Sequence, residues 1–251
     1  MHFISEQFLD EGITEREFTL GDFSGILWTP AAASSSTPVP LILIGQPGGF
    51  GIRRMYPRLV ARALSAAAHG FAAISIELPG AGTRTPLPDV EQARADLSRA
   101  VSAGDQPGAD VIDRLILSLV DQAVPEWQIT LDEVLDRPEI GEKVGYSGGV
   151  IAIGTRLAAI DSRIAAAGLF AGSYVPRATI EEARQITIPL HVLLQWDDEG
   201  NDRGMALDLF DAFASTEKTL CANMGGHTGV PHFAGEDAAR FFARHLGSSV
   251  G

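Results

Sequence analysis

Short apolar runs alternate with amphipathic segments along most of the chain. Residues 39–45 (VPLILIG) form an apolar, partly β-branched run that stops at a glycine, which predicts a buried strand. Residues 54–69 carry apolar side chains at helical spacing and end before Gly70, which predicts a helix. The same patterns predict strands at 71–78, 142–146, 165–170, 189–195 and 217–223, and helices at 148–160, 203–214 and 234–245. This alternation predicts an α/β fold with a mostly parallel sheet.

Two parts of the chain depart from the alternation. Residues 17–20 and 25–28 flank a Gly-Asp turn, which predicts an antiparallel hairpin before the first core strand. Residues 83–107 are polar and rich in Asp, Arg and Pro, and they are placed to form a small lid before a long helical pattern at 110–135. Because the alternation continues on both sides, we expect one domain over residues 1–251 with a lid insertion at 83–107.

Composition restricts the class of partner. The chain has 19 Lys and Arg against 32 Asp and Glu, a formal charge of −13, which argues against binding to nucleic acid or to an anionic membrane surface. The one cysteine, Cys221, excludes an intrachain disulfide. The N-terminal residues are acidic, and no apolar stretch approaches the length of a membrane span. We therefore expect a cytoplasmic protein with no membrane or nucleic-acid partner, and a homodimer is compatible with the sequence.

One pentapeptide carries a candidate nucleophile. Residues 145–149 (GYSGG) fit G-x-S-x-G, and they lie between a predicted strand and a predicted helix, which is the context of a nucleophile elbow. On such a turn the hydroxyl of Ser147 projects, and the helix N-terminus directs amide groups toward an oxyanion. Gly145 and Gly149 satisfy the need for small residues where strand and helix nearly touch. The alternative is that Ser147 only caps the helix.

A serine nucleophile needs a histidine base, and six histidines are available. His227 follows two glycines just beyond a predicted strand, in a loop from which an imidazole can reach across strand ends. His232 precedes the final helix and is the second choice. The others are explained as terminal, core or helix-end residues: His2, His69, His191 and His245.

We expect the carboxylate that orients the histidine to lie in residues 195–199 (QWDDE), at the end of the predicted strand at 189–195. Asp198 is the first choice, with Asp197 as its rival and Asp202 third. A run of acids at a strand end is often only a solvated loop. The chain order Ser147, Asp198, His227 is the order found in one particular fold class, and it favours the catalytic interpretation.

With these residues in place, the sequence resembles the α/β-hydrolase superfamily over about residues 17–246. The matching segments are LILIGQPGG, IELPGAGTR, GYSGG, QWDDE and GGH. Within the superfamily it is most similar to small esterases of the dienelactone-hydrolase type. The resemblance implies an eight-stranded, mostly parallel sheet with helices on both faces, no large cap, and a Ser147–His227–Asp198 triad. Gln195 stands where the family usually has a glycine.

Acyl transfer also needs donors aimed at the developing oxyanion. We expect one to be the N–H of Gly148 and the second to come from the loop at 46–51 (QPGGFG). Pro47 has no N–H, so Gly48 or Gly49 must donate. A phosphate-binding loop is the alternative, but this segment lacks the lysine of a P-loop. Side chains that flank the machinery and are candidates to line a substrate pocket are Phe50, Met55, Tyr146 and Trp196.

These features favour a serine hydrolase that cleaves a carboxylic ester, lactone or thioester of a small neutral substrate through an acyl-enzyme on Ser147. No cofactor is expected, and no zinc-ligand spacing is present, so no metal is expected. Two alternatives stay open. The same triad serves amide, carbon–carbon or lyase chemistry in the same fold. A hydrolase scaffold without catalysis can also serve as a binding module.

Overall fold

The computed structural model describes residues 1–9 and 12–247 and contains a nine-stranded sheet. Its strands are β1 (His2–Leu9), β2 (Ile13–Leu20), β3 (Phe23–Pro30), β4 (Val39–Gly45), β5 (Ala72–Ile76), β6 (Ile140–Gly148), β7 (Ile164–Phe170), β8 (Leu190–Gln195) and β9 (Lys218–Asn223). They are ordered β1-β2-β3-β5-β4-β6-β7-β8-β9. The first four in this order pair antiparallel and the rest pair parallel. The predicted mostly parallel α/β architecture is therefore confirmed.

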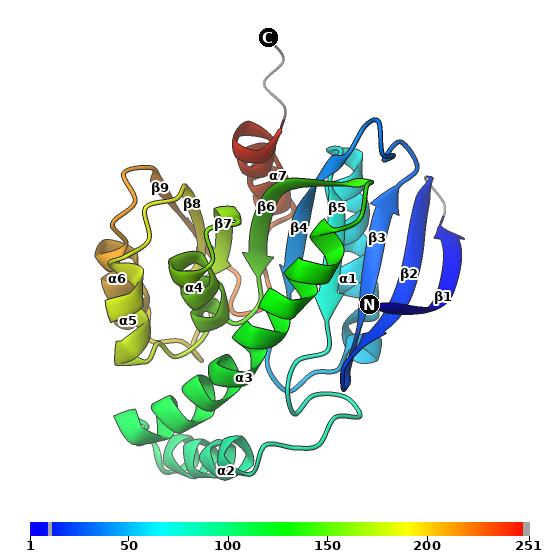
Figure 1. The fold of residues 1–251 in the computed structure, drawn as a ribbon. Helices are drawn as coiled ribbons and strands as arrows, with labels where there is room; N and C mark the ends of the chain where they lie inside the picture. The colour runs from blue at the N-terminus through cyan, green and yellow to red at the C-terminus, as the bar shows by residue number, and fades with distance from the viewer. Residues whose placement is uncertain (10–11, 248–251) are drawn as a thin grey trace.

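Helices cover both faces of the sheet. They are α1 (Ile52–Ala68), α2 (Pro88–Ala103), α3 (Ala109–Leu135), α4 (Ile151–Ile160), α5 (Arg177–Ala183), α6 (Arg203–Ala212) and α7 (His232–Leu246). In Figure 1, α3 and α4 lie in front of the sheet, and α1 and α7 lie behind it. Each face has its own buried apolar cluster, because the strands alternate their side chains between the two helix layers. None of the helices in the described part of the chain is long and apolar enough to cross a bilayer.

The sheet has nine strands where the resemblance implied eight. The additional strand is β1, which pairs antiparallel with β2 at the edge of the sheet. Its side chains are mostly exposed, so it lacks the alternation of apolar and polar residues that would have identified it. Phe3 is its main inward contact, packing edge-on against Phe18 with ring centroids 6.4 Å apart.

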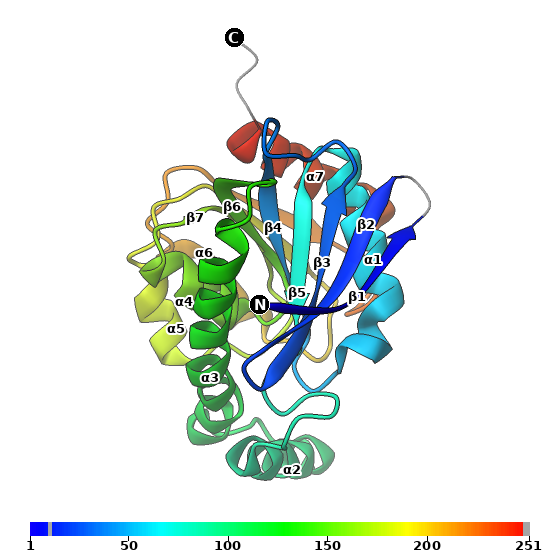
Figure 2. The same ribbon diagram turned by 45° about the vertical axis from the view of Figure 1, so that its right-hand side comes forward.

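The helix α2 lies within the polar segment for which we predicted a lid. Figures 1 and 2 both show it beyond the end of the sheet at which β6 terminates, packed against the N-terminal part of α3. The helix begins with Pro88 in its first turn, a position that needs no N–H, and it ends at Gly104 in the left-handed conformation. The segment is thus a helix placed over the edge of the sheet where candidate functional residues gather.

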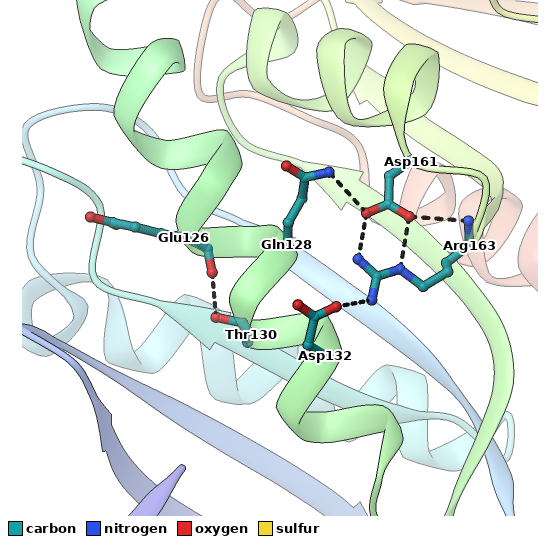
Figure 3. A network of polar contacts seen from close by, with 6 residues as sticks. All are labelled: Glu126, Gln128, Thr130, Asp132, Asp161 and Arg163. Carbon is teal, nitrogen blue, oxygen red and sulfur yellow. Dashed lines mark hydrogen bonds and ion pairs between the residues drawn. The ribbon is translucent and has the colours of Figure 1, made fainter.

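A polar network joins α3 to the segment between α4 and β7 (Figure 3). The guanidinium of Arg163 binds both carboxylate oxygens of Asp161, with distances of 2.8 and 2.6 Å, and it also binds Asp132 on α3. The amide of Gln128 donates to Asp161 as well. These contacts hold the pKa of Asp161 below its ordinary value, chiefly through the hydrogen bonds from Arg163. These contacts fix the long helix α3 to the C-terminal end of α4.

Candidate active site

Asp198 and His227 form a hydrogen-bonded pair beyond the ends of β8 and β9. Oδ2 of Asp198 lies 2.7 Å from Nδ1 of His227, and Oδ1 accepts a hydrogen bond of 3.0 Å from the backbone N–H of Gly200. The Asp198 side chain is 2% exposed, whereas that of His227 is 54% exposed. A buried carboxylate bound to Nδ1 fixes the tautomer and leaves Nε2 free to accept a proton.

His227 stands in the loop of residues 224–231 between β9 and α7, called here the histidine loop. Both carboxylate oxygens of Asp197 accept from the N–H of Gly225, and Oδ1 also accepts from the N–H of Gly226, 2.9 Å away. These backbone donors hold the pKa of Asp197 below its usual range. The amide of Gln195 donates to the carbonyl of Gly226 at 2.8 Å. Asp198 therefore contacts the histidine, while Asp197 and Gln195 hold its loop.

The other candidates for the base and the acid lie in different contacts. His232 is the first residue of α7, with a highly exposed side chain 3.5 Å from the Glu236 carboxylate. Asp202 caps α6 by accepting from the N–H of Met205. Neither residue touches the Asp198–His227 pair, so these two residues have local structural roles.

Ser147 lies within β6 and not at the tip of a turn. It pairs with Ile44 on one side and with Gly168 on the other. Its hydroxyl accepts a hydrogen bond of 3.1 Å from Nη2 of Arg62 on α1, which also donates to the Ser147 carbonyl. Within residues 1–9 and 12–247, no hydrogen bond joins Ser147 to His227. Of the predicted triad, Asp198 and His227 contact each other, whereas the hydroxyl of Ser147 is hydrogen-bonded to Arg62.

The turn between β6 and α4 begins after Ser147. Gly148 and Gly149 have φ of 69° and 73°, and α4 begins at Ile151. Val150 occupies the position between the glycines and the helix and is buried. A Cβ on Gly48, in the loop after β4, would lie 3.8 Å from Cγ2 of Val150, so this valine faces the loop predicted to bind an oxyanion.

Close packing explains two of the glycines in GYSGG. A Cβ on Gly145 would lie 2.8 Å from Leu246 and Phe242 of α7, and one on Gly149 would lie 2.7 Å from the backbone of Gly45. The expectation that both positions must be small agrees with this packing. For Gly145, the close neighbour is α7 and not the helix that follows the turn.

The predicted oxyanion donors lie in the loop after β4, which carries Gly48 and Gly49, and at the end of β6, where Gly148 lies. Neither Gly48 nor Gly49 donates its N–H to a partner in the part of the chain that the structure describes, so both amides are available. Gly148 ends β6, paired with Gly45. A Cβ on Gly49 would lie 2.9 Å from Nη2 of Arg94, which places the guanidinium of α2 directly over this loop.

A cavity of about 700 Å³ opens beside Asp198. It is lined by residues 104–107 after α2, residues 196–204 after β8, Val101 and Tyr174. Trp196 is the one predicted pocket residue that lines it, with the guanidinium of Arg203 4.3 Å from its ring centroid. Sequence patterns did not identify the residues that follow α2 individually, because a polar loop carries no periodic signal.

The other three predicted pocket residues lie elsewhere. Tyr146 is buried in the core, edge-on to Trp127. Met55 packs against the apolar cluster on the α1 and α7 face. Phe50 lies beneath the guanidinium of Arg54, 4.4 Å from it. No group of three or more His, Cys, Asp or Glu in the described residues has the arrangement of a metal site.

A mostly parallel sheet flanked by helices, with a glycine turn after β6, an Asp after β8 and a His after β9, defines the α/β-hydrolase fold. Solved structures with this fold match nearly the whole chain. A cold-adapted esterase from an Arctic intertidal metagenomic library has 25% identity and a TM-score of 0.70, covering 98% of this chain and all of its own.

Two further solved structures have the same architecture. The acetyl xylan esterase from Paenibacillus sp. R4 has 18% identity and a TM-score of 0.68, over 98% of this chain and 88% of its own. The dienelactone hydrolase from Anabaena variabilis has 17% identity and a TM-score of 0.60, over 96% and 98%. No protein-family model and no curated protein matches the sequence. The structural likeness agrees with the branch of esterases and dienelactone hydrolases that the sequence resembles.

Proposed function

We propose that the protein hydrolyses a carboxylic ester, or the related lactone or thioester, with His227 as general base and Asp198 as its orienting carboxylate. The observation that carries this proposal is the 2.7 Å hydrogen bond between the buried Asp198 and the accessible His227. Asp198 also lines a cavity of about 700 Å³. The solved structures of similar fold include esterases and a dienelactone hydrolase, which supports an acyl bond as the target.

In this proposal the attacking oxygen comes from water, because the hydroxyl of Ser147 is bound to Arg62. Nε2 of His227 removes a proton from the water as its oxygen attacks the acyl carbon. The N–H groups of Gly48 and Gly49 stabilise the resulting oxyanion. Collapse of the intermediate breaks the carbon–oxygen bond and releases the carboxylic acid. His227 returns the proton to the leaving alkoxide, and Asp198 stabilises the imidazolium between these steps.

The acyl-enzyme mechanism predicted from sequence, with Ser147 as nucleophile, is the competing mechanism. The chain order Ser147, Asp198, His227 supports it. It requires that Arg62 release the hydroxyl and that the hydroxyl reach Nε2 of His227. The two mechanisms share the base and its carboxylate, so Ser147 alone distinguishes them.

The proposed substrate is small and uncharged. The cavity beside Asp198 is lined by several carboxylates, including Asp105 and Glu199, which make no ion pair among the described residues and disfavour an anionic substrate. We also propose that residues 83–107 act as a small lid, because α2 lies over the loop that carries Gly48 and Gly49.

The experiment compares the hydrolysis of p-nitrophenyl acetate and butyrate by wild type and three variants. We expect His227→Ala to lose at least about 10³-fold in kcat/KM, and His232→Ala, the matched control in the same region, to lose less than about twofold. We expect Ser147→Ala to lose less than about tenfold. A fluorophosphonate probe should leave the wild type unlabelled.

Two results would overturn parts of the proposal. Stoichiometric labelling that is abolished by Ser147→Ala, together with a loss of about 10⁴-fold in that variant, would establish the acyl-enzyme mechanism instead. Equal measurable activities of wild type and His227→Ala would refute a hydrolase that depends on this pair. Absence of turnover in both proteins would favour a binding module built on the hydrolase scaffold.

A further inference from the structure

Arg62 is a partly buried cation that lacks a carboxylate partner. It lies on α1, and Nη1 donates to the carbonyl of Gly45 at 2.9 Å while Nη2 donates to the carbonyl and hydroxyl of Ser147. No ion pair with Asp or Glu reaches this guanidinium among the described residues, in a chain with 32 acidic side chains. Nε–H and the second Nη1–H have no partner within that same part of the chain.

The environment of this cation is apolar. Burial lowers the pKa of Arg62 to about 10, so the group stays charged at neutral pH but has lost much of its hydration. The two carbonyls stabilise the charge with partial dipoles only. An anion with a full negative charge would stabilise it more strongly, because attraction between opposite charges grows where water is excluded.

Arg62 lies at one side of a groove between α1 and α7, on the face of the sheet opposite α3 and α4. The floor is formed by Ile42 and Ile44 of β4, and Phe71 and Phe242 close two sides. The groove exists because the helix positions that meet across it are small. These positions are Ser65 and Ala66 on α1, and Gly235, Ala238 and Ala239 on α7.

The size of the groove limits its occupant. The accessible volume is about 120 Å³, which is the share of liquid volume taken by roughly four water molecules. An organic anion of five or six non-hydrogen atoms matches this volume. Its charged end must meet Arg62, and the rest of it must be hydrocarbon, because the remaining walls offer mainly aliphatic and aromatic carbon.

We propose that the groove between α1 and α7 binds a short-chain monocarboxylate of propionate or butyrate size, with its carboxylate on Arg62 and its alkyl chain against Ile44 and Phe242. The site lies on the α1 and α7 face, and its residues differ from those that line the cavity beside Asp198. It does not depend on the hydrolase activity proposed above. Ser147 lines it as the partner of Arg62.

The test is a titration of the protein with sodium butyrate, followed by calorimetry and by the backbone amide signals of the groove residues Ala66 and Ala238. Butyramide has the same shape without the charge, and inorganic phosphate has charge without the alkyl chain. We expect saturable binding of butyrate with shifts centred on the groove. Butyramide and phosphate should bind at least tenfold more weakly.

Two variants test the two halves of the site. Arg62→Met keeps most of the side-chain length without the charge, and it should weaken butyrate binding at least tenfold. Arg58→Met removes the same charge one turn earlier on α1, from an exposed side chain without an ion pair in the described structure, and should change binding less than twofold. Ala238→Leu fills the groove but keeps Arg62, and should also weaken binding at least tenfold.

Five outcomes would overturn the proposal. The first is the absence of butyrate binding up to about 100-fold above the protein concentration and into the ~10 mM range. The others are unchanged affinity in Arg62→Met, unchanged affinity in Ala238→Leu, phosphate binding as tight as butyrate binding, and a loss of butyrate affinity in His227→Ala. His227→Ala should retain butyrate affinity within twofold. A loss in that variant would place butyrate beside His227 and not in the groove. A folded Ala238→Leu variant keeps the test valid even where Arg62→Met fails to fold.

Discussion

Replacing Asp198 by Asn removes the negative charge of the carboxylate while keeping the shape of the side chain. In the wild type, Oδ1 accepts from the N–H of Gly200 and Oδ2 accepts from Nδ1 of His227. In Asp198→Asn, the amide oxygen keeps the bond from Gly200, so the NH₂ group faces the imidazole. The histidine must then accept at Nδ1 and carry its proton on Nε2, where it can no longer act as a base.

The size of the effect follows from the separation of the charges. When His227 takes a proton, its positive charge lies about 4 Å from the charge of Asp198, which corresponds to about 4 kcal/mol at an effective dielectric constant of about 20. Because each 1.36 kcal/mol is about tenfold in rate, loss of this stabilisation lowers kcat by on the order of 10³-fold. The buried position of Asp198 prevents water from replacing the carboxylate.

The neighbouring residue gives a matched control. Asp197→Asn removes the same charge one position earlier, but the carboxylate it replaces contacts only the backbone of the histidine loop. The amide oxygen of Asn still accepts from one of those N–H groups, so we expect less than about fivefold loss in kcat. Both variants are measured with p-nitrophenyl butyrate from pH 6 to 9, and ¹⁵N NMR of the imidazole reports the tautomer of His227 independently of turnover.

Equal losses in Asp197→Asn and Asp198→Asn would refute this reasoning, since long-range charge would then explain both. An unchanged His227 tautomer in Asp198→Asn would refute it as well. The tautomer measurement remains informative where activity toward the chosen ester is low.

Three further substitutions test close packing at the β6–α4 turn, the support of the histidine loop, and the ion pair between Asp161 and Arg163. Gly149→Ala forces a Cβ to 2.7 Å from the backbone of β4 at a φ of 73°. We expect this to lower the free energy of unfolding by at least about 2 kcal/mol, measured as a fall in Tm of about 4–8 °C. An unchanged Tm would contradict the close approach. Gln195→Leu leaves the Gly226 carbonyl without its donor and should lower kcat more than it raises KM, and a change in KM alone would count against a role in holding the histidine loop. Asp161→Asn loses charge-assisted bonds to Arg163. Because the folded-state pKa of Asp161 is depressed, its stabilisation of about 1–2 kcal/mol is present above about pH 4 and disappears as pH falls through the folded-state pKa. Urea unfolding of wild type and variant should therefore converge at low pH, and a constant difference would refute the assignment.

Sequence patterns predicted the parts of this fold that bury apolar surface. The runs at 39–45, 165–170 and 189–195 became β4, β7 and β8 within a residue at either end, because strands buried on both faces are almost continuously apolar. The edge strand β1 was not predicted, because its exposed side chains leave no periodic pattern of apolar residues. It pairs with β2, the next strand along the chain, but its own side chains carry no alternation that marks it as a strand.

The sequence also predicted that Asp198 and His227 lie near each other, because both follow strands of the parallel sheet. In a parallel sheet, loops after successive strands meet at one edge, so Asp198 after β8 and His227 after β9 had to lie close together. Sequence alone left Asp197 and Asp198 open, because adjacent residues at a strand end share the same pattern. Only the direction of each side chain decides which carboxylate faces the imidazole and which binds the backbone of Gly225.

The position of the turn after β6 depends on a different property. The pattern G-x-S-x-G fixes only the glycines two positions before and after Ser147, while the backbone turns where positive φ is least costly, and GYSGG offers a further glycine at 148. Gly148 and Gly149 take those angles, and the ladder with β4 therefore continues through Ser147. Strand alternation then directs its side chain to the α1 and α7 face, where Arg62 binds it. A glycine-rich strand end thus separates Ser147, which fits the motif, from Gly148 and Gly149, which occupy the turn, and Val150 follows them as the residue before α4.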